Sequence, residues 1–176
     1  MKKLYYTLKP FANRYTVLII WLLAVLNFYF CCKPLLDYGA SIGSNKFPIV
    51  LDSLYYFTPD DGYEVLSNLG DQGRQAYIDF ILPISLFLSL SLPNLAMNKG
   101  PAYIIAPFLY MISDYIENLA EKYVLEIYPN RHDTIMSLAC YAGLLKMFFF
   151  WSSLFILIVN GLIYQCRSTD QKQKSK

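Results

Sequence analysis

The chain has 176 residues, of which 56% are hydrophobic and 16% are charged. Soluble domains contain about 45–50% apolar and about 25% charged residues, so this composition excludes an ordinary soluble domain. The net charge is only +2 and the basic residues gather near the two termini, which gives no support to a nucleic-acid-binding protein. The composition predicts an integral membrane protein with the lipid bilayer as its first partner.

The first predicted span covers residues 16–32, an apolar run that follows a basic amino-terminal arm. Such a run is about long enough to cross a bilayer when aromatic and cationic residues anchor its ends. It continues into Cys31-Cys32-Lys33-Pro34 without a small-x-small cleavage pattern, so we interpret it as a retained helix and not as a signal peptide. Asn27, about midway along it, is expected to hydrogen-bond to a neighbouring helix.

Residues 33–76 form the only long loop of the prediction, and this loop is rich in acidic side chains. A short helix is predicted within it over residues 59–70, because Thr58 can cap its start and Pro59 suits its first position. Its apolar side chains recur on one face, and Gly70 is a plausible stop. We expect this amphipathic helix to lie on the membrane surface or on the bundle.

Three further spans are predicted at residues 77–97, 102–120 and 137–164. Prolines within the spans are expected to kink the helices, which membrane helices tolerate when neighbouring groups satisfy the released carbonyls. The tail, residues 165–176, is polar and cationic and is predicted to be disordered. The predicted fold is therefore an all-α bundle of four transmembrane helices in one membrane domain, with the amphipathic helix in its first external loop.

The lysines and arginines set the predicted orientation. Four lie in the amino-terminal arm, four lie in the tail and Lys99 lies in the turn between the second and third spans, whereas the long loop has three. Because cytoplasmic segments carry an excess of Lys and Arg, both termini are predicted to be cytoplasmic. The long loop is then external or lumenal.

The third predicted span carries a row of polar residues at its far end. Asp114, Glu117, Asn118 and Glu121 are separated by three or four residues, so they share one face of a helix. An acidic group at the centre of a membrane helix costs about 2.5–3.5 kcal/mol on insertion scales. This face must therefore turn toward a helix bundle, a wet cavity or the membrane boundary.

Depth along each span indicates which polar residues meet. With about 1.5 Å of rise per residue, Asp114 lies roughly 18 Å from the cytoplasmic side, and Asn27 and Lys146 lie roughly 17 Å from it. These three residues are predicted to share one level near the midplane, where an aspartate and a lysine together cost far less than either alone. Asp79 is predicted to belong to a second layer near the external edge, with Glu117, Asn118 and Glu121.

Two interpretations of this cluster stay open at this point. In one, Asp114 and Lys146 form a structural ion pair that fixes helix register. In the other, the cluster lines a cavity that opens to the external side and handles a small polar ligand, protons or ions. The excess of carboxylates over the single Lys146 favours proton exchange or cation binding.

Other chemistry has little support in the sequence. The cysteines form no C-x-x-C pair and the chain has one histidine, His132, so neither a metal site nor a cofactor is expected. A disulfide between Cys31 or Cys32 and Cys140 stays an alternative, because these residues lie near the external ends of their spans.

Three stretches carry a resemblance to known proteins. They are Tyr56-Phe57-Thr58-Pro59, the run from Leu69-Gly70 through Gly73-Arg74 to Tyr77, and Asp114-Tyr115-Ile116-Glu117-Asn118. Over about residues 55 to 150 the chain resembles a set of small, uncharacterised four-span membrane proteins. The resemblance implies the four-span architecture and no particular activity. It singles out Gly70, Gly73, Arg74, Asp79, Asp114, Glu117, Asn118 and Lys146.

The guanidinium of Arg74 is expected to reach Asp79 or Glu117 at the external layer. The preferred function is that of a multi-pass membrane protein whose polar cluster binds a small polar ligand or conducts protons or ions. One alternative is a non-catalytic assembly subunit with a membrane-protein partner or a second copy of itself. Another is a membrane enzyme that acts on a lipid-like substrate with Asp114 or Glu117 as acid or base.

Overall fold

The computed structural model describes residues 1–41, 56–75, 80–97 and 99–174, and side chains for 1–34, 37, 56–68, 80–97 and 99–166. In these residues the regular structure is entirely helical, as predicted. In chain order the elements are α1 (Lys2–Leu8), η1 (Lys9–Phe11), α2 (Arg14–Ser41), α3 (Pro59–Gln75), α4 (Leu82–Ala96), η3 (Pro101–Ile104), α5 (Ile105–Ile127) and α6 (Asp133–Lys174).

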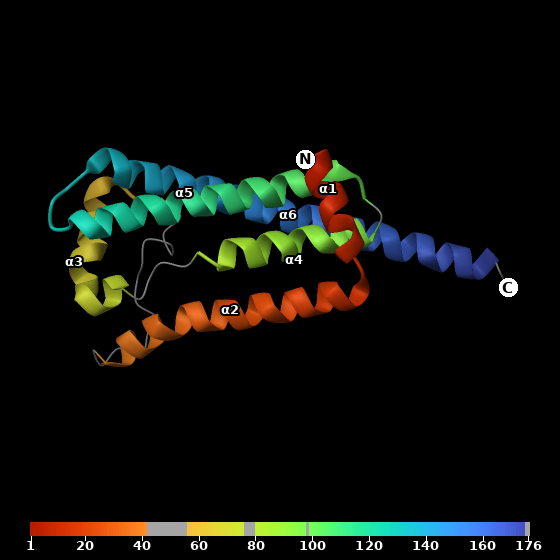
Figure 1. Ribbon diagram of the computed structural model, residues 1–176, viewed down its shortest axis with the longest axis horizontal. Coiled ribbons are helices and arrows are strands. Elements are labelled where there is room, and N and C mark those ends of the chain that lie inside the picture. The colour runs from red at the N-terminus through yellow and green to blue at the C-terminus, as the bar shows by residue number, and fades with distance from the viewer. Residues whose placement is uncertain (42–55, 76–79, 98, 175–176) are drawn as a thin grey trace.

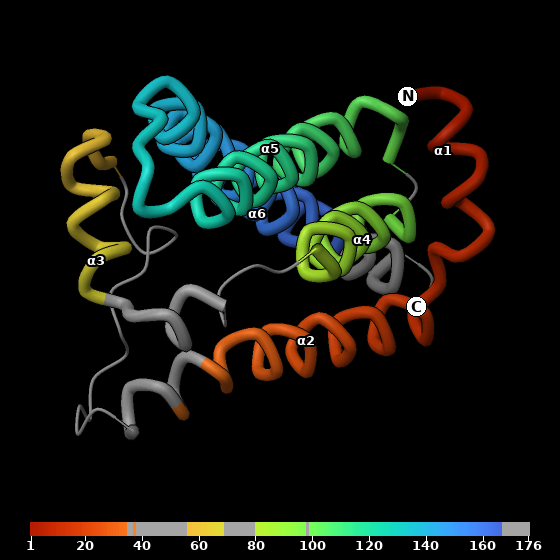
Figure 2. The backbone as a smooth tube through the Cα atoms, turned by 60° about the vertical axis from the view of Figure 1, so that its left-hand side comes forward, coloured from red at the N-terminus to blue at the C-terminus, as the bar shows by residue number. Residues whose placement is uncertain are grey.

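Helices α2, α4, α5 and α6 run side by side, and α1 and α3 cross the two ends of the array (Figure 1). Helix α4 lies between α2 on one side and α5 with α6 on the other, as two views show (Figure 2). Helix α1 crosses one end, which we call the α1 end, and α3 crosses the opposite end, the α3 end. The last part of α6 extends beyond the α1 end.

Two helices are long and apolar enough to cross a membrane: Arg14–Pro34 of α2 and Asp133–Cys166 of α6. Only 6% and 22% of their most apolar windows are buried within the protein. A core helix of a soluble protein would be mostly buried, so these two helices instead present apolar surface outward. Helix α4, at 15 residues, is a shorter apolar helix.

Helix α5 has its polar residues inside and its apolar residues outside. The exposed side chains are spaced by three or four residues along one stripe: Ile105, Leu109, Ile112, Ile116, Leu119 and Tyr123. The opposite face buries Ser113, Asp114, Glu117, Asn118 and Glu121. A soluble amphipathic helix has the reverse arrangement, and the exposed stripe is about 27 Å long at 1.5 Å per residue.

Several predicted boundaries were wrong, mostly because the helices are longer than the apolar runs. The first helix continues through Pro34 to Ser41, into the predicted loop, and α6 continues to Lys174 where disorder was predicted. Helix α3 passes through Gly70, the predicted stop, and ends at Gln75. A glycine costs a helix only about 1 kcal/mol, which neighbouring helical residues can offset.

Two of the three prolines in the predicted spans fall near the start of a helix. Pro83 falls in the first turn of α4 and Pro107 is the third residue of α5. The first amides of a helix have no intrahelical acceptor, so a proline there removes no hydrogen bond. Pro93 does lie inside α4, near its carboxyl end.

Helix α3 packs on the bundle through its apolar face. Leu66 and Tyr63 join a buried cluster with Val124 of α5 and with Met136 and Cys140 of α6. The prediction of an amphipathic helix is confirmed, and packing on the bundle end is the arrangement observed. The helix begins as predicted, at Pro59.

Polar contacts fasten the amino-terminal turn of α3. The Thr58 backbone N–H and hydroxyl both donate to Oδ2 of Asp61, at 2.8 and 2.7 Å, and these bonds lower the pKa of the Asp61 carboxyl. Arg131, in the turn between α5 and α6, donates to Asp60 at 2.5 Å and to Asp133 at 3.2 Å. Both bonds stabilise the charged guanidinium and so raise the pKa of Arg131, the bond to Asp60 more than the bond to Asp133.

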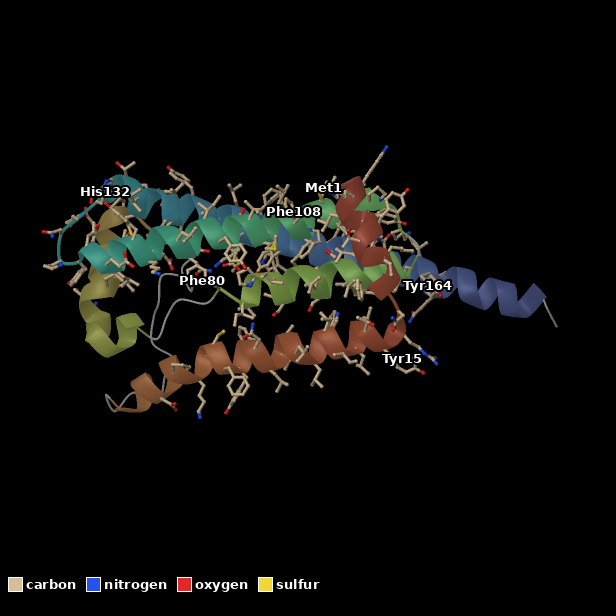
Figure 3. All side chains as sticks on the ribbon, viewed as in Figure 1. Met1, Tyr15, Phe80, Phe108, His132 and Tyr164 are labelled. Atoms are coloured by element: carbon tan, nitrogen blue, oxygen red, sulfur yellow. The ribbon has the colours of Figure 1, made fainter. Side chains whose placement is uncertain are left out.

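The amino-terminal residues pack on α4 and η3 at the α1 end. Leu4, Tyr5 and Leu8 pack against Leu95 and Ile104. The Lys9 ammonium donates to the carbonyl of Leu95 at 2.7 Å, at the carboxyl end of α4, where an intrahelical donor is missing. Figure 3 shows Met1, Tyr15 and Tyr164 at this end and His132 at the α3 end.

Candidate functional site: a buried acidic cluster around Lys146

Four ionisable side chains meet between α5 and α6. Asp114, Glu117 and Glu121 come from the buried face of α5, and Lys146 comes from α6. Their exposed fractions are 5%, 3%, 2% and 7%, in that order. We call these four residues the acidic cluster.

Lys146 lies between two carboxylates. Its Nζ atom is 2.5 Å from Oε2 of Glu117 and 3.7 Å from Oδ1 of Asp114. The predicted Asp114–Lys146 pair is therefore present, but the shorter contact is to Glu117, which the sequence placed in a separate layer. One turn of helix separates Asp114 from Glu117, so a single long lysine side chain reaches both.

Asp114 is held by its own helix as well. The hydroxyl of Tyr110 donates to Oδ2 of Asp114 at 2.7 Å, and the Asn118 amide donates to Oδ1 at 3.3 Å. Both donors lie four residues from the aspartate, one on each side, which is the spacing at which helical side chains meet. Asn118 was predicted to share a helix face with Asp114 but to lie in the external layer, and it bonds to Asp114 directly. Tyr110 was missed, although its spacing from Asp114 gives the signal.

Gly143 makes room for Glu117. A methyl group at position 143 would lie 2.6 Å from Oε1 of Glu117, well inside van der Waals contact. The absence of a side chain on α6 at this point lets the glutamate reach Lys146. The sequence offered no direct signal for this role, because it does not show which residue of α5 faces Gly143 of α6.

The acidic cluster is covered at its α3 end by apolar side chains. Beyond Glu121 the next inward-facing residues are Val124 on α5 and Met136 on α6, both fully buried, and Leu66 of α3 lies over them. In the part of the chain that the structure describes, the cluster thus does not open toward the α3 end. This differs from the predicted cavity on the external side, because α3 packs onto the bundle end.

Asn27 does not join the acidic cluster. Its Nδ2 donates to Oγ of Ser85 on α4 at 3.3 Å, and its Oδ1 accepts a weak bond from Cys31 Sγ at 3.9 Å. The prediction of a bond to a neighbouring helix is confirmed. Asn27 was predicted to lie at the same level as Asp114 and Lys146. It does not contact them in the structure, because α2 packs mainly on α4.

The predicted partners at the external edge lie outside the described residues. Asp79 falls between α3 and α4 in a stretch that the structure does not describe, so its place relative to Glu117 stays a prediction. Arg74 belongs to α3, but its side chain is likewise outside the described set. The expected contact of Arg74 with either carboxylate is therefore untested.

A second buried polar contact joins α4 to α6. Nδ2 of Asn160 donates to Oδ1 of Asn94 at 2.8 Å, and both side chains are buried. Ser91, one turn before Asn94, and Ser153, two turns before Asn160, are buried as well. Sequence reasoning missed these residues, although Lys146, Ser153 and Asn160 recur at intervals of seven.

Within the described residues, Cys31, Cys32, Cys140 and Cys166 form no disulfide with one another. The alternative of a bond from Cys31 or Cys32 to Cys140 was wrong, because Cys140 is buried under α3, where its sulfur accepts the Phe57 N–H at 3.4 Å. Nor does the described part of the chain gather three or more His, Cys, Asp or Glu side chains in an arrangement that could hold a metal ion.

Comparisons with known protein families, with curated proteins and with solved structures found no match for this chain.

Proposed function

We propose that the protein is a four-span integral membrane protein whose acidic cluster holds an exchangeable proton within the bilayer. The spans are α2, α4, α5 and α6. The apolar outer stripe of α5 supports its inclusion, although its buried polar residues lower its mean hydropathy. Helix α4 is short, about 22 Å at 1.5 Å per residue, but it is enclosed by the other three helices and meets little lipid.

The charge excess of the acidic cluster carries this proposal. Three carboxyl groups lie on the buried face of α5 and Lys146 lies on α6, and all four groups are at most 7% exposed. Among the described side chains, the Lys146 ammonium contacts Asp114 and Glu117. Because buried charge is very costly in a medium of low dielectric constant, we infer that a proton on one of the carboxyl groups contributes to the charge balance, and such a proton can be exchanged.

The distribution of charge at the two ends supports the orientation. Lys2, Lys3, Lys9, Arg14 and Lys99 lie at the α1 end. The described side chains of the α3 end include Asp37, Asp60, Asp61, Glu64, Glu126 and Asp133 against Lys33, Lys122 and Arg131. Following the positive-inside rule, the α1 end faces the cytoplasm and α3 lies on the external or lumenal side.

The cluster can be tested by infrared difference spectroscopy of the full-length protein in liposomes across the neutral pH range. We expect a carboxylic acid C=O band that titrates, and that changes in Glu117→Gln and in Glu121→Gln. The exposed Glu126→Gln variant should leave the band unchanged, since Glu126 pairs only with Lys122 at the surface. If no such band is present, the proposal is wrong.

A structural role is the second candidate, and the contacts of Asp114 favour it. Its two oxygens are engaged by Tyr110, Asn118 and Lys146, as in a network that fixes the register of α5 on α6. A purely structural role predicts that Asp114→Asn combined with Lys146→Met restores the stability that either change removes. It also predicts that the spectrum of the wild type shows no titrating carboxyl group.

A further inference from the structure

Buried polar side chains continue from the acidic cluster toward the α1 end. On α6, Ser153 and Asn160 follow Lys146 at successive intervals of seven residues, and all three are buried. Seven residues are close to two helical turns, so these side chains share one face of α6. Near the α1 end this face meets α4, where Asn160 bonds to Asn94.

The spacing along the helices places these groups in order. At about 1.5 Å of rise per residue, Ser153 lies about 10 Å and Asn160 about 21 Å beyond Lys146 along α6. Ser91 precedes Asn94 by three residues, so it lies about 4.5 Å nearer to the acidic cluster. Tyr110 donates a hydrogen bond to Asp114. It precedes Asp114 by four residues on α5, so it lies about 6 Å from Asp114 toward the α1 end.

Successive members of this row are thus separated by about 4–6 Å along the bundle axis. A water molecule with two hydrogen bonds of about 2.8 Å each joins polar atoms about 5 Å apart, so water between the helices is the means by which groups at this axial spacing are linked. The hydroxyl of Ser91 is fully buried and has no hydrogen-bond partner among the described residues, so it can both donate and accept. The hydroxyl of Ser153 donates to the carbonyl of Phe149 at 2.6 Å, and its oxygen can still accept.

The opposite direction has no comparable row in the described residues. Beyond Glu121 the inward-facing side chains are the apolar Val124, Met136 and Leu66, each with an exposed fraction of 0%. The acidic cluster therefore has polar neighbours toward the α1 end and apolar neighbours toward the α3 end.

We propose that the row formed by Tyr110, Ser153, Ser91, Asn94 and Asn160 is the path by which protons pass between the acidic cluster and the water at the α1 end. This inference rests on the proposed function and adds the side from which the cluster is reached. A proton that enters near Asn160 passes along hydroxyls and bridging waters and bonds to a carboxylate oxygen, which becomes a carboxylic acid. On release that O–H bond breaks, and the carboxylate remains beside the Lys146 ammonium.

The path can be tested by the rate at which the cluster exchanges hydrogen for deuterium. The full-length protein in liposomes is transferred into heavy water, and the shift of the carboxylic acid C=O band is followed with time. We expect exchange to slow about tenfold (about 1.4 kcal/mol) in Ser91→Ala and in Ser153→Ala. We expect a larger loss in Asn94→Leu combined with Asn160→Leu.

Ser152→Ala is the matched control for Ser153→Ala. Both hydroxyls donate to the carbonyl four residues earlier, but Ser152 is only half-buried and lies off the row. Its exchange should match that of the wild type. Because the Ser91 hydroxyl has no partner to lose, Ser91→Ala should also retain the wild-type melting temperature, which separates a slower path from a damaged fold.

The outcomes separate this inference from the function on which it rests. A band that is present and exchanges at the wild-type rate in Ser91→Ala, in Ser153→Ala and in the double asparagine variant would overturn the path and leave the proposed function standing. The absence of any cluster band would overturn both. Slower exchange in all three, with Ser152→Ala unchanged, would establish the path.

Discussion

The ammonium of Lys146 lies 2.5 Å from Oε2 of Glu117, and Gly143, one turn before Lys146 on α6, has no side chain to block the glutamate. The ion pair and the missing side chain thus depend on one register of α5 against α6. The predictions below follow from this register and from the burial of the groups that it brings together.

Gly143→Ala should destabilise the protein, because the new methyl group would lie 2.6 Å from Oε1 of Glu117. Glu117 cannot move away easily while Lys146 holds it. We expect a loss of about 1–3 kcal/mol, typical of overpacking, measured by denaturation in detergent.

Gly161→Ala on the same helix is the control for that change. A methyl group there would have nothing within 4 Å. This variant should match the wild type or gain up to about 1 kcal/mol from the better helix propensity of alanine. Equal effects of the two substitutions would contradict the packing of Glu117 against Gly143.

Lys146→Met should be strongly destabilising, because it leaves Glu117 and Asp114 buried without their cation. Removing one partner of a buried ion pair costs about 3–5 kcal/mol. Lys122→Met on α5 breaks an exposed pair, at 3.9 Å from Glu126, and should cost less than about 1 kcal/mol. The same detergent denaturation measures both, and a Lys146→Met protein as stable as the Lys122→Met protein would refute the pairing.

Tyr110→Phe should weaken the protein by removing the hydrogen bond to Asp114. A hydrogen bond to a charged group contributes about 1.5–3 kcal/mol. Tyr141→Phe on α6 removes a hydroxyl from an exposed ring and should change stability by no more than about 0.5 kcal/mol. The melting temperatures of the two variants are the comparison, and a shift in Tyr141→Phe alone would count against the bond.

The amino-terminal turn of α3 should loosen in acid. The two bonds from Thr58 lower the pKa of the exposed Asp61 carboxyl. Their stabilising contribution is fully present above the ordinary aspartate pKa, and it is lost as the pH falls through the lowered value.

Amide hydrogen exchange in α3, corrected for the intrinsic pH dependence, measures this loosening. Exchange in the first turn should rise as the pH falls through the acidic range. In Asp61→Asn the same amides should exchange at a rate independent of pH. A wild type that also shows no pH dependence would contradict the role of the Thr58–Asp61 contacts.

The pairing of Asp114 with Lys146 could be predicted because depth in a membrane follows from residue count along each span. The contact to Glu117 could not, since it depends on the length of one lysine side chain and on Gly143 in the facing helix. The same counting did not identify the partner of Asn27. That partner is Ser85 of α4, so Asn27 bonds to a different helix from the two that hold the acidic cluster.

Element lengths were less predictable than element existence. Hydropathy marks the apolar part of a helix, but α2 and α6 continue into polar sequence because the backbone hydrogen bonds continue. The packing of α3 over this end of the bundle could not be predicted from the sequence either. It requires Leu66 to meet Val124 and Met136, and these residues are far apart in the chain.

The depth of the acidic cluster in the bilayer can be measured with a nitroxide spin label at position 116. Ile116 is exposed on the outer face of α5, between Asp114 and Glu117 in sequence. The label requires a background in which the four native cysteines are replaced, and that background should first be shown to retain the wild-type melting temperature. The account predicts that the label collides readily with dissolved oxygen, which enriches in the bilayer, and rarely with a water-soluble nickel complex. Ready collision with the nickel complex would place the label, and the cluster behind it, in water, which would contradict the account.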